Sequence, residues 1–82
     1  MVEFLRGGSV KTWTERIREL REDSDMKQQD IANLLQTTQQ VYSRYEKGIN
    51  EIPVRHLILL ARFYNVSLDY IVGETDNRKR YT

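Results

Sequence analysis

Residues 28–48 of this chain, Gln-Gln-Asp-Ile-Ala-Asn-Leu-Leu-Gln-Thr-Thr-Gln-Gln-Val-Tyr-Ser-Arg-Tyr-Glu-Lys-Gly, predict two short helices joined by a tight turn. We expect the first helix over about 28–35 and the second over about 39–47. The first helix has apolar side chains only at positions that must pack: Ile31, Ala32, Leu34 and Leu35. Thr38 is suited to cap the start of the second helix, and Gly48 is suited to end it.

The second of these helices presents a polar stripe at helical spacing, formed by Gln39, Gln40, Ser43, Arg44 and Lys47. Amides and cations match the edges of DNA bases and their phosphates better than carboxylates do. The pattern therefore predicts a helix-turn-helix domain that binds double-stranded DNA.

An earlier helix is predicted to begin at Thr12, because Thr12 and Glu15 have the spacing of a capping box. Its apolar side chains recur on one face, at Trp13, Ile17 and Leu20. A polar loop over 22–25 is expected to end it. Residues 1–11 contain a Gly-Gly-Ser run and are interpreted as a flexible leader.

Two further helices are expected after the polar stripe. Pro53 suits the first turn of a helix that continues to about Tyr64, and Ser67 is suited to cap a shorter helix over 68–72. With no strand pattern in the sequence, the prediction is a compact all-α domain of five helices over 12–73. A polar tail over 74–82 carries Arg-Lys-Arg and is interpreted as solvated.

The composition excludes several classes of protein. The chain has 82 residues, no cysteine and a formal net charge of +1. No apolar run approaches the roughly 20 residues of a membrane span, and residues 1–10 do not resemble a signal peptide. We therefore expect a soluble, cytoplasmic protein.

No catalytic or metal-binding pattern is present in the sequence. The one histidine, His56, has no cysteine or paired acid at ligand spacing, and we expect it to be partly exposed on its helix. There is no glycine-rich phosphate loop and no nucleophile with a plausible base. We therefore predict no enzyme activity, no metal, no cofactor and no small-molecule ligand.

Four pieces of sequence, in order, carry a resemblance to a known family: 17–22, 28–32, 45–48 and 66–73. The stretch from about Ile17 to Gly73 resembles the Cro/C1-type (Xre-like) helix-turn-helix regulators. The string Thr37-Thr38-Gln39-Gln40 is similar to the start of the recognition helix in lambdoid phage repressors. The resemblance implies a lambda-repressor-like fold.

The resemblance and the polar stripe together give expected roles to individual residues. The residues expected to read base edges are Gln39, Gln40 and Arg44. Those expected to contact phosphates are Gln28, Thr38, Ser43 and Lys47. The resemblance also implies a buried ion pair between Arg21 and Glu46. Gln39 and Gln40 also have a simpler interpretation, as solvated surface amides.

The sequence departs from the family in two places. Gln36 stands where the family usually has glycine, so the turn requires a positive φ at a residue that disfavours it. Tyr42 and Tyr45 replace smaller aliphatic residues, so bulkier packing is expected beneath the second helix of the motif.

The resemblance and the excess of late apolar residues favour a homodimeric repressor that binds a palindromic operator. The side chains predicted at the dimer interface are Phe63, Tyr64, Leu68, Tyr70 and Ile71. The alternative is an antitoxin or adaptor that uses the same fold to bind protein, because a fold does not fix a function. The amide-rich, basic stripe favours DNA.

Overall fold

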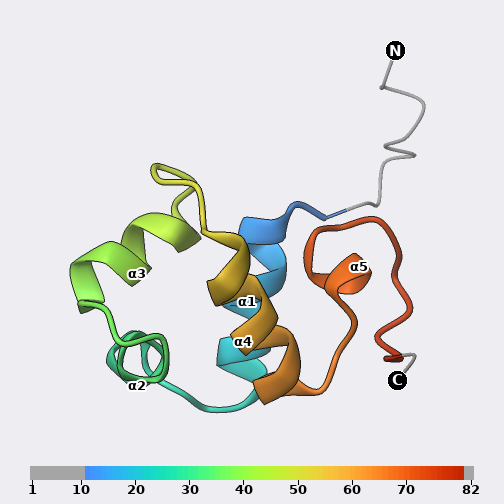
Figure 1. Ribbon diagram of the computed structural model, residues 1–82, viewed down its shortest axis with the longest axis horizontal. Helices are drawn as coiled ribbons and strands as arrows, with labels where there is room; N and C mark the ends of the chain where they lie inside the picture. Colours follow the sequence, from blue (N-terminus) through green and yellow to red (C-terminus); the bar gives the residue numbers. More distant parts are fainter. Residues whose placement is uncertain (1–10, 81–82) are drawn as a thin grey trace.

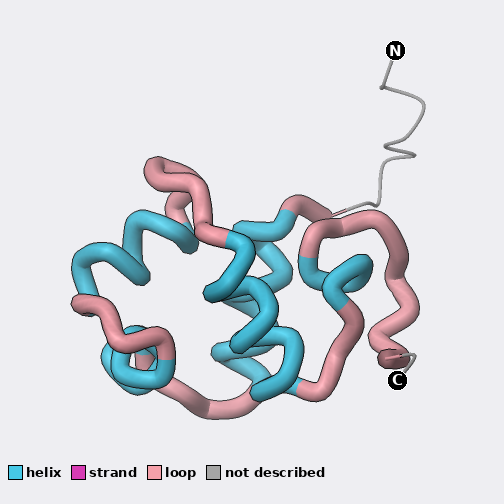
Figure 2. The backbone as a smooth tube through the Cα atoms, viewed as in Figure 1, coloured by secondary structure: helices cyan, strands magenta, loops and turns pink. Residues whose placement is uncertain are grey.

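Five helices, and no strand, account for the secondary structure of residues 11–80, the part of the chain that the computed structural model describes (Figures 1 and 2). They are α1 (Trp13–Asp23), α2 (Gln28–Leu34), α3 (Gln39–Glu46), α4 (Val54–Tyr64) and α5 (Leu68–Ile71). The prediction of an all-α, five-helix domain is confirmed. The predicted leader lies outside the described residues except for Lys11.

Hydroxyl side chains cap three of the helices at the expected places. The Thr12 and Glu15 capping box forms, with the Thr12 amide 2.9 Å from Glu15 Oε1. The hydroxyl of Thr38 accepts the Val41 amide at 3.2 Å, and that of Ser67 accepts the Tyr70 amide at 3.0 Å. Each such cap stabilises its helix by about 1 kcal/mol.

The end of α1 differs from the prediction of a polar loop over 22–25. The helix continues to Asp23, and the Ser24 amide still bonds the Leu20 carbonyl at 3.2 Å. The chain leaves the helix only at Asp25, which has a left-handed φ of 57°. The charged side chains of Glu22 and Asp23 therefore did not end this helix. They are exposed in its last turn, where a charged side chain does not destabilise a helix.

Every helix contributes one large side chain with no appreciable exposed surface to a single core. These side chains are Ile17, Ile31, Tyr42, Leu60 and Ile71. Burying one such aliphatic side chain stabilises the fold by about 1.5 to 3 kcal/mol. In Figure 1, α4 crosses the middle of the molecule, between the α2–α3 pair and α5. The core thus fixes the orientation of the motif against the rest of the domain.

The turn between α2 and α3 forms despite the missing glycine. Gln36 adopts φ of 58°, and the next amide, that of Thr37, bonds the Ala32 carbonyl at 2.9 Å. A left-handed conformation at a residue other than glycine costs about 1 kcal/mol or more. Packing of the surrounding helices offsets this cost. The turn therefore keeps its left-handed geometry although Gln36 is less suited to it than glycine.

The predicted dimer interface requires a correction. Tyr70 and Ile71 are 5% and 0% exposed, because α5 turns their side chains into the core. The prediction is wrong for these two residues, which offer no surface to a partner. Tyr64 is half-buried and its hydroxyl is covered. Phe63 and Leu68 remain exposed, at 45% and 40%.

The segment that follows α5 packs back onto the domain, whereas the sequence predicted a solvated tail. The buried Arg16 guanidinium lies 4.0 Å from the Tyr70 ring centre, and its Nη2 is 2.5 Å from Asp76 Oδ1. Arg78 donates from Nε to the Tyr70 hydroxyl at 3.2 Å, and its carbonyl accepts the Ser67 amide at 3.0 Å. The Arg78 side chain is still 55% exposed, so this part of the tail is solvated as predicted and is also fastened to the domain.

His56 is also placed differently from the expectation of partial exposure. It is 6% exposed, and its Nδ1 lies 3.2 Å from the Tyr45 hydroxyl, beneath α3. Burial, with a smaller contribution from the charge of Arg55, lowers the pKa of His56 below its usual 6.5. The neutral ring is thus part of the packing that supports α3.

This burial predicts a pH dependence of stability. Below about pH 6.5 the unfolded chain takes up a proton at His56 that the folded domain resists, so the free energy of unfolding falls as the pH falls. Urea unfolding at pH 7.5 and pH 5.5 measures the loss, and His56→Gln is the control because its amide can still bond the Tyr45 hydroxyl. An equal loss in the wild type and His56→Gln would contradict the assignment.

Within the described part of the chain, no helix has the length and apolar character needed to cross a bilayer.

Candidate nucleic-acid interface

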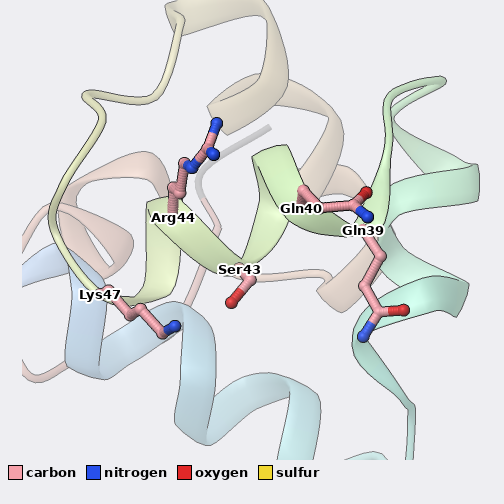
Figure 3. Close-up of a pocket in the computed structure, with 5 residues that line it drawn as sticks. All are labelled: Gln39, Gln40, Ser43, Arg44 and Lys47. Carbon is pink, nitrogen blue, oxygen red and sulfur yellow. The ribbon is translucent and has the colours of Figure 1, made fainter.

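The polar stripe predicted from the sequence forms a single surface on α3. Gln39, Gln40, Arg44 and Lys47 are exposed and Ser43 is half-buried. The same five residues line a shallow, open hollow of about 370 Å³ (Figure 3). The structure therefore brings together on one helix all three expected base-reading residues and two of those expected to contact phosphate.

The opposite side of α3 fixes how this surface is presented. Tyr42, Tyr45 and Glu46 are buried, at 0%, 5% and 9% exposure. The rings of Tyr42 and Tyr45 meet edge to face, with centroids 6.2 Å apart. Aromatic pairs of this kind prefer that geometry. Because these three side chains are held in the interior, the rotation of α3 about its own axis is fixed.

Arg21 and Glu46 form a two-pronged ion pair that joins α1 to α3. Arg21 Nε and Nη2 lie 2.7 and 3.0 Å from the two oxygens of Glu46, and Nη1 donates to the Met26 carbonyl at 3.0 Å. Burial alone would raise the pKa of Glu46, but hydrogen bonding, above all from Arg21, outweighs it and holds the pKa below its usual value. Glu46 is thus charged at neutral pH.

Gln28, the first residue of α2, is tied into the same ion pair. Its Nε2 donates to Glu46 Oε1 at 3.1 Å, so one of its two amide hydrogens is used. The second hydrogen remains for another acceptor. Thr38 is in a comparable position, because its hydroxyl oxygen accepts from Val41 and its hydroxyl hydrogen stays available.

The charge on the outward face of α3 has one sign. The helix contains a single acid, Glu46, which is buried and neutralised by Arg21. Arg44 and Lys47 supply two exposed cations, and no hydrogen bond or ion pair within residues 11–80 holds either side chain. The face can therefore pair with an anion without first breaking an internal contact.

Buried Arg16 and buried His56 are the polar residues that sequence reasoning missed. Arg16 lies three residues after Trp13 and one turn before Leu20, on the apolar face of α1, and that placement was an available signal. His56 gave no such signal, because its partner Tyr45 belongs to another helix.

Comparison with known proteins gives consistent similarities. The sequence profile of a helix-turn-helix family matches residues 17–71. The chain is 34% identical over 65 residues to YobD, an uncharacterised HTH-type transcriptional regulator of Bacillus subtilis, which covers 79% of this chain and 58% of that protein. It is 30% identical over 64 residues to RstR, a cryptic phage CTXphi transcriptional repressor from Vibrio cholerae, over 78% of this chain and 58% of RstR.

Two solved structures share the fold. A transcriptional regulator from Listeria innocua aligns with a TM-score of 0.73 and 27% identity, over 76% of this chain and 58% of that one. The DNA-binding domain of the P22 c2 repressor aligns with a TM-score of 0.70 and 22% identity, over 79% and 86% of the two chains. The chain spans little more than half of the curated relatives YobD and RstR, and both are named as regulators rather than enzymes.

Proposed function

The chain belongs to the helix-turn-helix family, and we propose that it is a DNA-binding transcriptional repressor that inserts α3 into the major groove. One observation carries the proposal: the outward face of α3 is amide-rich, positively charged and free of internal contacts. Its inner face is held by the core and by the ion pair of Arg21 with Glu46. A rigid helix with such a surface suits base edges and phosphates.

The proposed contacts divide into two classes. Gln39, Gln40 and Arg44 face base edges. Gln28, Thr38, Ser43 and Lys47 bind phosphates, which position a protein on DNA without specifying sequence. Gln28 and Thr38 support this division, because each keeps one hydrogen-bond donor available while its other contact fixes the side chain.

We further propose that residues 12–73 form the DNA-binding unit and that two copies bind a palindromic operator. Half-sites about one helical turn apart fit a two-fold dimer of such domains. Phe63 and Leu68 support the proposal as exposed apolar side chains at the end of α4 and in α5. Leu68 also lines a hollow of about 340 Å³ with Ile58, flanked by Arg62 and Arg80.

Selection of binders from a random library of DNA duplexes tests the proposal. The expected result is enrichment of one palindromic consensus whose half-site centres lie about 34 Å apart. Folded protein that enriches no sequence would contradict the proposal and favour the alternative, an antitoxin or adaptor that binds protein through this fold.

A further inference from the structure

The outward face of α3 carries a restricted set of chemical groups. It offers two amides, a hydroxyl, a guanidinium and an ammonium, and it has neither a carboxylate nor an apolar side chain. In the major groove, carboxylates accept from the cytosine amino group and apolar side chains contact the thymine methyl. Amides pair with the N6 and N7 of adenine, and guanidinium pairs with the O6 and N7 of guanine. The face therefore matches purine edges.

Gln40 and Arg44 form a pair on one edge of this face. They are separated by four residues, so they leave α3 on successive turns on the same side. Both are exposed, and no hydrogen bond or ion pair of the described residues restrains either side chain. Figure 3 shows Arg44 directed away from Ser43 and Lys47, on the other edge of the helix.

The other polar residues do not form an equivalent pair with Arg44. Gln39 remains a proposed base contact, but it lies one residue before Gln40 and so leaves α3 about 100° around the helix from it. Lys47 follows α3 as its C-cap residue, and its ammonium is a point charge without the planar fork of a guanidinium. Ser43 has a short side chain that is half-buried, and a hydroxyl pairs with any base. Gln40 and Arg44 are therefore the pair that combines a spacing of one helical turn with chemical selectivity.

The rise of the helix sets the distance between the two contacts. Four residues advance an α-helix by about 6 Å. Successive base pairs are about 3.4 Å apart along the duplex. A helix that lies along the groove therefore places the two side chains about two base pairs apart.

From this spacing we infer that Gln40 reads an adenine and that Arg44 reads a guanine about two base pairs away in the same half-site. This assignment rests on the proposed function, because it names the operator chemistry of the same surface. It gives Arg44 a role in specificity in addition to its charge.

The test compares the consensus sequences enriched from a random duplex library by the wild type, Gln40→Ala, Arg44→Ala and Arg44→Gln. In the wild type we expect A·T and G·C base pairs at the stated spacing in each half-site. Arg44→Ala should reduce the preference for the G·C pair by about 5- to 100-fold and leave the A·T preference unchanged. Arg44→Gln should convert the G·C preference to A·T.

Arg18→Ala, an exposed arginine on α1, is the matched control and should leave the consensus unchanged. A wild-type consensus without this pair of bases would overturn the assignment but not the proposed function. Equal weakening of every sequence by Arg44→Ala would also overturn it, since that result makes Arg44 a phosphate contact. A wild type that enriches no sequence overturns both proposals.

Discussion

Replacing Gln39, Gln40 and Arg44 together by alanine is expected to abolish sequence-specific DNA binding while the domain remains folded. All three side chains are exposed, and none makes a hydrogen bond or ion pair within residues 11–80, so their loss removes no structural contact. Each base contact contributes about 1 to 3 kcal/mol of discrimination. The combined loss should therefore reduce affinity for the selected operator by at least about 100-fold.

Fluorescence anisotropy with the selected operator and with a scrambled duplex measures this effect. Weak, salt-dependent binding to both duplexes should persist, because the proposed phosphate contacts remain. Circular dichroism checks that the helices are intact. If the triple variant still prefers the operator over the scrambled duplex as strongly as the wild type does, α3 is not the element that reads sequence.

Arg21→Ala is expected to lower the free energy of unfolding by about 3 to 5 kcal/mol, a large part of the stability of a small domain. The substitution leaves the Glu46 carboxylate buried without its counter-charge, while the neutral amide of Gln28 still donates to it. Urea unfolding at pH 7 measures the effect. Arg18→Ala serves as the control, because its side chain is exposed on the same helix.

Two further measurements separate the loss of the ion pair from a general packing defect. The double variant Arg21→Met, Glu46→Leu should recover most of the lost stability, because it removes the unpaired charge. The deficit of Arg21→Ala should also shrink as the pH falls. The lowered pKa of Glu46 means that its stabilising contribution is present above its usual pKa of 4.5 and is lost on acidification. A deficit that is independent of pH would argue for packing alone.

The helices of this domain were predictable because their signals are local. Thr12, Thr38 and Ser67 lie at cap positions where a short side chain accepts a nearby amide, and the structure shows all three bonds. The polar stripe of α3 was equally accessible, because helical spacing alone places its residues on one face. Gln36 was identified by resemblance, and its φ of 58° shows that the turn keeps its left-handed geometry.

The contacts that were not predictable join residues distant in sequence. Arg16 and Asp76 are 60 residues apart, and nothing in either local sequence indicates the other. His56 is buried because of a tyrosine on another helix. Tyr70 and Ile71 were assigned to the surface because apolar residues late in a small chain suggested a partner. α5 instead turns them inward, and its short length made their orientation unpredictable from periodicity.

Arg16 on α1 is joined through Tyr70 and Asp76 to the segment that follows α5. The stable domain therefore extends beyond the residues that carry the recognition motif. A protein trimmed at Gly73, where the last helix has ended, would still contain every residue proposed to touch DNA. It would lack Asp76 and Arg78, and the guanidinium of Arg16, stacked on Tyr70, would lose its counter-ion. The residues after α5 are therefore expected to stabilise the DNA-binding unit, although they are not among those proposed to bind DNA.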